Sequence, residues 1–190
     1  MLAPVLRQPL RQVSSEQIEV FGEVLRDEVN LAVWQRPLAA SVSAFAAQLV
    51  AQGEPLAQSI TLELASAESA PNIRGLVDDY SHLPGQAAFL DDVSGLVSAF
   101  AYLFDARRIG LRLRILDKPM CPRFHVDHVP VRLITSYVGV GTEWLSEGVM
   151  ARRRLGDAAA EPSDARQVER ASAGHVLLAK GEKWIGNEGC

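Results

Sequence analysis

The chain has 190 residues, of which 48% are hydrophobic, and its formal net charge is −4 at pH 7. This length fits one domain, residues 1–190, with a core of its own, and the acidic balance argues against a nucleic-acid-binding surface despite the run Arg152–Arg154. Two cysteines are too few for a disulfide framework, and neither a secretory signal nor a run of about 18 apolar residues stands out, so we expect a cytoplasmic protein.

The N-terminal part, residues 1–107, is expected to be mainly helical. Apolar residues recur at helical spacing in four segments, at about residues 18–25, 41–50, 56–64 and 86–104. Serines precede or open the first two of these segments and are good N-cap residues. The aromatic side chains of the apolar stripe in the fourth segment are interpreted as core.

The pattern changes near residue 108. Ile109, Leu111, Leu113 and Ile115 alternate with glycine and arginine, which predicts a strand. Further strands are predicted at residues 124–129, 131–138 and 175–179. Helices followed by strands indicate an α+β protein in which the β-rich part, residues 108–190, carries the functional site.

The candidate site is the segment 121–128, Cys-Pro-Arg-Phe-His-Val-Asp-His. On a strand, His125 and Asp127 share one face and offer a nitrogen and an oxygen to one cation, which suits iron, manganese or zinc better than calcium or magnesium. Cys121 lies on the same face and adds a sulfur that zinc accepts. His128 lies on the other face, either as a further ligand or as a histidine satisfied by a backbone carbonyl.

Alternatives to a metal site follow from the same residues. His125 and Asp127 also fit an ordinary contact on a half-exposed strand, and Pro122 bends the chain so that Cys121 is then a small buried hydrophobe. A serine hydrolase is not indicated, because the sequence lacks a Gly-x-Ser-x-Gly elbow. A phosphate loop is not indicated either, because Gly139-Val-Gly141 lacks the third glycine and the lysine.

Six stretches of the chain resemble a bacterial family known as domain of unknown function 1826. They are Asn30–Leu38, Met120–Arg132, Thr135–Tyr137, Gly141–Leu145, Leu178–Gly181 and Trp184–Asn187. The resemblance spans most of the chain. It implies a link to zinc homeostasis, since members of this family tend to be encoded beside zinc-responsive bacterial genes.

The His125-x-Asp127 pair also resembles the start of the iron-binding triad of 2-oxoglutarate-dependent oxygenases. That resemblance implies helices packed on an antiparallel β-sandwich or a cupin-like double-stranded β-helix, with Fe(II) as metal and 2-oxoglutarate as co-substrate. Arg132 is then the catalytic-site residue that positions an anionic group of a small-molecule substrate. The late histidine of the triad is expected beyond Lys180 and is not found before Cys190, which leaves His175 as its substitute.

The sequence therefore leaves three hypotheses about function. The first is a non-haem iron oxygenase that uses His125, Asp127 and Arg132. The second is a non-catalytic zinc-binding protein in which Cys121 and His128 add ligands to the same pair. The third is an interaction module in which the segment 121–128 is only structural.

Overall fold

The computed structural model describes residues 9–187. Cys190, the last residue of the predicted β-rich part, therefore lies outside the described residues. The chain divides into two compact units. The first unit comprises Met1–Pro37 and Cys121–Cys190, and the second comprises Leu38–Met120. The predicted boundary at residue 107 falls inside the second unit, between its long helix and the strand that follows.

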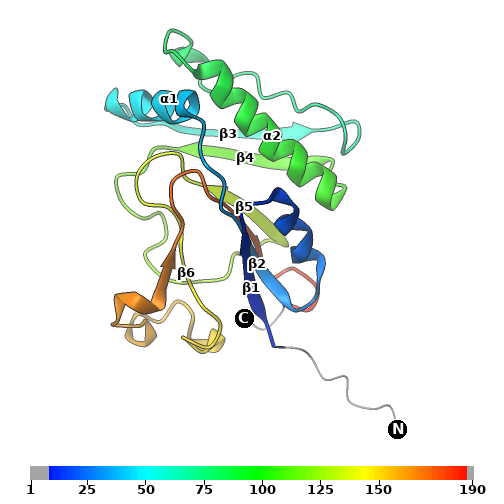
Figure 1. Cartoon of the computed structure of the whole chain (residues 1–190), viewed down its shortest axis with the longest axis vertical. Helices are drawn as coiled ribbons and strands as arrows, with labels where there is room; N and C mark the ends of the chain where they lie inside the picture. Colours follow the sequence, from blue (N-terminus) through cyan, green and yellow to red (C-terminus); the bar gives the residue numbers. More distant parts are fainter. Residues whose placement is uncertain (1–8, 188–190) are drawn as a thin grey trace. The chain divides into compact units, whose positions relative to one another are not determined.

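A four-stranded sheet organises the first unit. Its strands are β1 (Arg11–Ser15), β2 (Val29–Trp34), β8 (Val176–Lys180) and β5 (Val131–Thr135), in the order β1-β2-β8-β5. β1 runs parallel to β2, and β8 is antiparallel to both of its neighbours. A parallel pair needs a crossover, which the 3-10 helix η1 (Ile18–Leu25) supplies while burying Val20, Phe21 and Val24 (Figure 1).

Smaller elements complete this unit. β6 (Glu143–Leu145) pairs with β7 (Val168–Arg170) in a separate antiparallel ladder. Three short 3-10 turns lie between these strands in the sequence: η3 (Arg152–Arg154), η4 (Ala158–Ala160) and η5 (Ala165–Gln167). Trp144 packs on a buried apolar cluster of Leu31, Val33, Ala171 and Leu177, which joins the β6 region to the main sheet.

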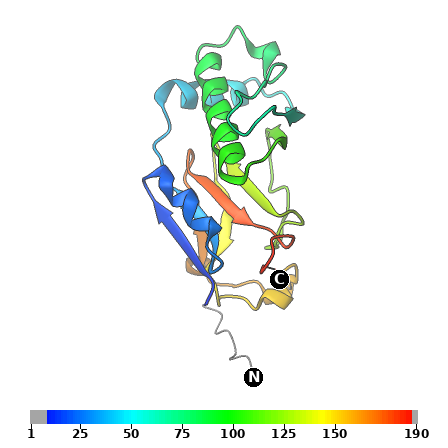
Figure 2. The same ribbon diagram turned by 90° about the vertical axis from the view of Figure 1, so that its right-hand side faces the viewer.

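The second unit combines a hairpin with two helices. β3 (Ala57–Glu63) and β4 (Arg108–Arg114) are antiparallel, and α1 (Ala40–Ala51) and α2 (Gln86–Phe104) lie on one side of them, with the short η2 (Asp78–Tyr80) before α2 (Figure 2). The rings of Phe45 and Phe89 meet at 5.1 Å between the helices. Gly85 permits this approach, because a Cβ there would lie 2.5 Å from the Ser41 carbonyl oxygen.

Helix α2 is long and apolar enough to span a bilayer when judged by length and composition alone. The fold accounts for much of that apolar character. Five of its residues are buried, namely Phe89, Val93, Leu96, Val97 and Ala101. They form the core-facing stripe that the sequence pattern predicts for this helix.

The α+β prediction is confirmed, and so are the helix at residues 86–104 and the strands corresponding to β4, β5 and β8. Two elements were predicted wrongly. Residues 57–63 form a strand, because Ile60 and Leu62 face inward with period two. Residues 124–129 form no strand. Among the described residues the sheets are small and open, and none closes into a barrel.

Candidate functional site

The segment that carries His125 and Asp127 is an irregular stretch held against the end of β8. The Glu182 N–H donates to the Asp127 carbonyl at 2.9 Å, and the Gly181 N–H donates to the Pro130 carbonyl at 2.8 Å. A Cβ at position 181 would lie 1.8 Å from the Val129 carbonyl oxygen and 2.5 Å from that of Asp127. Only glycine therefore permits this close approach.

His125 and Asp127 face each other although no strand places them. The Nε2 atom of His125 lies 3.4 Å from Oδ1 of Asp127, with side chains 44% and 18% exposed respectively. The Nδ1 atom lies 2.9 Å from the Arg123 carbonyl oxygen. Because a carbonyl only accepts hydrogen bonds, Nδ1 carries a proton, and this bond orients the ring with Nε2 toward the carboxylate.

Arg132, on β5, contacts the same carboxylate oxygen of Asp127 as His125 does. Its Nη1 atom lies 2.9 Å from Oδ1 of Asp127. The guanidinium is thus engaged by Asp127, and the two groups fix each other's orientation. The predicted role of Arg132 in binding an anionic substrate would require it to share or release this partner.

The other two predicted ligands lie apart from the pair. His128 forms an ion pair through Nδ1 with the Glu182 carboxylate, and its side chain is 75% exposed. Cys121 is an exposed free thiol. Across residues 9–187, no group of three or more histidine, cysteine, aspartate or glutamate side chains is placed to hold a metal ion. The structure therefore gathers two of the four predicted metal ligands.

His175, the predicted substitute for the late histidine, occupies a different environment. It lines a cavity together with Trp144 and Glu169. Its backbone is fixed by the Thr135 hydroxyl, which donates to the His175 carbonyl at 2.9 Å. Among residues 9–187, His175 does not form a three-residue metal site with His125 and Asp127.

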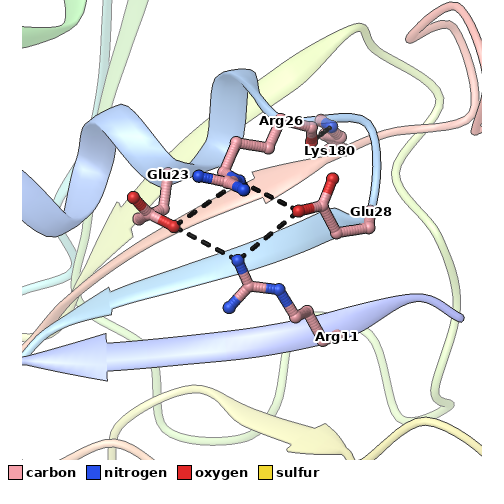
Figure 3. A network of polar contacts seen from close by, with 5 residues as sticks. All are labelled: Arg11, Glu23, Arg26, Glu28 and Lys180. Carbon is pink, nitrogen blue, oxygen red and sulfur yellow. Dashed lines mark hydrogen bonds and ion pairs between the residues drawn. The ribbon is translucent and has the colours of Figure 1, made fainter. Parts of the chain in front are cut away.

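A charged network on the same unit was not predicted from the sequence. Arg11 and Arg26 alternate with Glu23 and Glu28, and the shortest contact joins Arg26 Nε to Glu28 Oε1 at 2.9 Å (Figure 3). A hydrogen bond from its own backbone N–H and another from Arg26 lower the pKa of Glu28. The network links β1, the end of η1 and the start of β2.

Lys180 adjoins this network and is 5% exposed. Its Nζ donates to the Arg26 carbonyl at 2.7 Å and lies 4.9 Å from the centre of the Trp184 ring. Burial lowers the pKa of Lys180, and the nearby charges of Asp27 and Glu28 oppose that shift. These contacts give the ammonium group a structural role, so it is not available to clamp a carboxylate beside Asp127.

Glu147 forms another set of polar contacts that was not predicted from the sequence. Its carboxylate accepts from Asn30 Nδ2 at 2.5 Å and from Arg152 at 2.6 Å. Burial acts to raise the pKa of Glu147, but the hydrogen bond and charge of Arg152 and the Asn30 amide together lower it. Arg152, the first residue of the arginine run, therefore belongs to an ion pair.

Comparison with known proteins gives one positive result. The family model described as "Protein of unknown function (DUF1826)" matches residues 15–190. The chain therefore belongs to this family, which confirms the resemblance seen in its signature stretches. No curated protein and no solved structure matches the chain.

Proposed function

We propose that this protein binds a divalent transition-metal ion between His125 Nε2 and Asp127 Oδ1, and that this ion is zinc. One observation carries the proposal. The hydrogen bond between Nδ1 and the Arg123 carbonyl holds the ring so that Nε2 points at Oδ1 of Asp127, and a metal ion can replace a proton between these two atoms. The same Oδ1 also accepts from Arg132, so a bound ion would share this oxygen with the guanidinium.

The distance between the two atoms supports a bridging ion over a direct hydrogen bond. A charge-assisted bond between an imidazolium and a carboxylate measures about 2.7–2.9 Å. A tetrahedral zinc ion bound at about 2.1 Å to each atom holds its nitrogen and oxygen ligands about 3.4 Å apart. The observed separation of 3.4 Å fits the second geometry.

Zinc is favoured over iron because of the number of ligands. The iron site of an oxygenase uses two histidines and one carboxylate on one face of the metal. Among residues 9–187, only one histidine and one carboxylate, those of His125 and Asp127, come together here. Zinc accepts a nitrogen and an oxygen from the protein, with water or a partner's side chain in the remaining positions. Our choice is therefore a non-catalytic zinc-binding protein that uses His125 and Asp127, without the Cys121 and His128 ligands that the second hypothesis included.

The oxygenase with a cupin-like β half is the second candidate, and the order His125-x-Asp127 is what favours it. It needs a third ligand, an open position for 2-oxoglutarate and a cation for that oxoacid. Arg132 is near enough to serve as this cation but is engaged by Asp127. Turnover of 2-oxoglutarate under air by the protein loaded with Fe(II), lost in His125→Ala, would support this candidate.

Isothermal titration of the tag-free protein with zinc tests the main proposal. We expect one equivalent to bind to the wild type, and binding to be lost in both His125→Ala and Asp127→Asn. His128→Ala and Cys121→Ser serve as matched controls from the same segment, and we expect both to bind zinc as the wild type does. Loss in the controls together with retention in the first two variants would contradict the assignment.

A further inference from the structure

A cavity of about 300 Å³ opens in the first unit, and it is independent of His125 and Asp127. Its walls come from five places in the sequence. The side chains that matter for binding are Gln12 and Ser14 of β1, Gln35 after β2, Trp144 and Ser146 in and after β6, and His175 before β8.

The cavity is built on fixed parts of the fold. Trp144 packs on the buried cluster around Leu31 and Leu177. Gln12 donates its side-chain N–H to the Leu145 carbonyl at 2.8 Å, so its Oε1 is left as an acceptor. The His175 N–H donates to the Ser172 carbonyl at 3.1 Å. A site with anchored walls loses little conformational entropy when a ligand binds.

The charges of the lining argue against an anionic ligand. Glu169 and Arg170 have opposite charges and lie next to each other in the chain. Arg170 is also paired with Glu143, with Nε 2.9 Å from Oε1 of that glutamate. Arg170 is therefore neutralised by a carboxylate outside the lining, so the lining offers no free cation to hold an anion, and Glu169 adds an acceptor for the hydroxyl groups of a ligand.

The polar groups argue against an apolar ligand. Covering amides and hydroxyls with hydrocarbon leaves their hydrogen-bonding groups unsatisfied, which is unfavourable. Amide, hydroxyl and imidazole groups both donate and accept hydrogen bonds, and so do the hydroxyl groups of a ligand. The chemistry of the lining thus matches a neutral molecule that is rich in hydroxyl groups.

We propose that this cavity binds a neutral sugar ring. The apolar C–H face of the ring lies against the Trp144 indole, and its hydroxyl groups bond to Gln12, Gln35 and His175. Cavities that take small molecules measure about 300–1,000 Å³. At about 300 Å³ this cavity has room for one ring and not for an oligosaccharide.

Saturation-transfer NMR on the full chain tests this proposal. The probes are D-glucose, D-galactose and D-ribose, with adenosine and glucuronate as comparison compounds of other classes. We expect transfer from the protein to the C–H protons of at least one sugar. Removing one hydrogen-bonding partner in Gln35→Ala should weaken that signal about five- to tenfold. Gln52→Ala, a glutamine just after α1, is the matched control and should leave the signal unchanged.

Three outcomes would overturn the proposal. These are the absence of transfer to all three sugars, transfer confined to adenosine or glucuronate, and a sugar signal unaffected by both Gln35→Ala and Trp144→Phe. Thermal melting of each variant establishes that it is folded. Ser146→Ala replaces any variant that is not, with the same expected loss of signal.

Discussion

Gly181 lies directly against the Val129 backbone, at a distance that leaves no room for a side chain. A Cβ at this position would lie 1.8 Å from the Val129 carbonyl oxygen. This contact brings the end of β8 beside the segment that carries Asp127, where the Glu182 and Gly181 N–H groups bind it. The close packing of glycine, and not a strand, thus positions the candidate site.

Replacing Gly181 with alanine should therefore destabilise the protein. We expect the free energy of unfolding to fall by about 3 kcal/mol, because the backbone must shift to relieve the clash. Chemical denaturation followed by circular dichroism measures this quantity. Gly95→Ala is the control, since Gly95 lies inside α2 with open space around it. That change should stabilise the helix by about 0.5–1 kcal/mol. Equal effects of the two substitutions would contradict the packing argument.

Glu147→Gln should destabilise the protein at neutral pH by about 1–2 kcal/mol, because the amide keeps the Asn30 contact but loses the charged bond to Arg152. The pKa of Glu147 is lowered from its ordinary value of 4.5. Its contribution is therefore present above that value and is lost as the pH falls through the lowered pKa.

Denaturation of wild type and Glu147→Gln between pH 7 and pH 3 measures this difference in stability. It should shrink toward zero at the acid end of the range. Glu68→Gln, at an exposed position, is the control and should have little effect at any pH. A difference for Glu147→Gln that stays constant over the range would contradict the assigned ion pair.

Lys180 should make stability rise with pH in the alkaline range. Burial lowers its pKa from the ordinary value of 10.5. Between the lowered pKa and 10.5, the unfolded chain binds more protons than the folded chain, so raising the pH favours folding. Lys180→Met retains a long apolar side chain and cannot titrate. The stability of the wild type relative to this variant should increase as the pH approaches 10.5, and a flat difference would show that the ammonium is not buried.

The spacing of apolar residues correctly predicted the elements that bury only one face. The stripe of α2 and the alternation of β4 are of this kind, because each buries one side. β2 was missed because five of its six residues are buried, which leaves no alternation to detect. β3 was taken for a helix because Gln58 occupies its inner face, where it binds the backbone of Gly75 and Val77.

The candidate site was predictable in composition but not in geometry. The sequence indicated His125 and Asp127 as a pair, and the structure places them face to face. It did not indicate that Arg132, five residues on, binds the same carboxylate, because the chain between them is irregular. Nor did it indicate that His128 turns to Glu182, because this partner is distant in the sequence. The contact of Gly181 with Val129 brings these distant segments together, and no local pattern reveals such a contact.

The most direct test of the metal proposal is the ¹⁵N NMR signal of the His125 ring, with and without zinc. The structure predicts that Nδ1 carries the proton in the free protein and that added zinc shifts the Nε2 signal while Nδ1 remains protonated. Asp127→Asn should abolish the shift. An Nε2 signal that zinc leaves unchanged would contradict the proposal that His125 and Asp127 hold a metal ion.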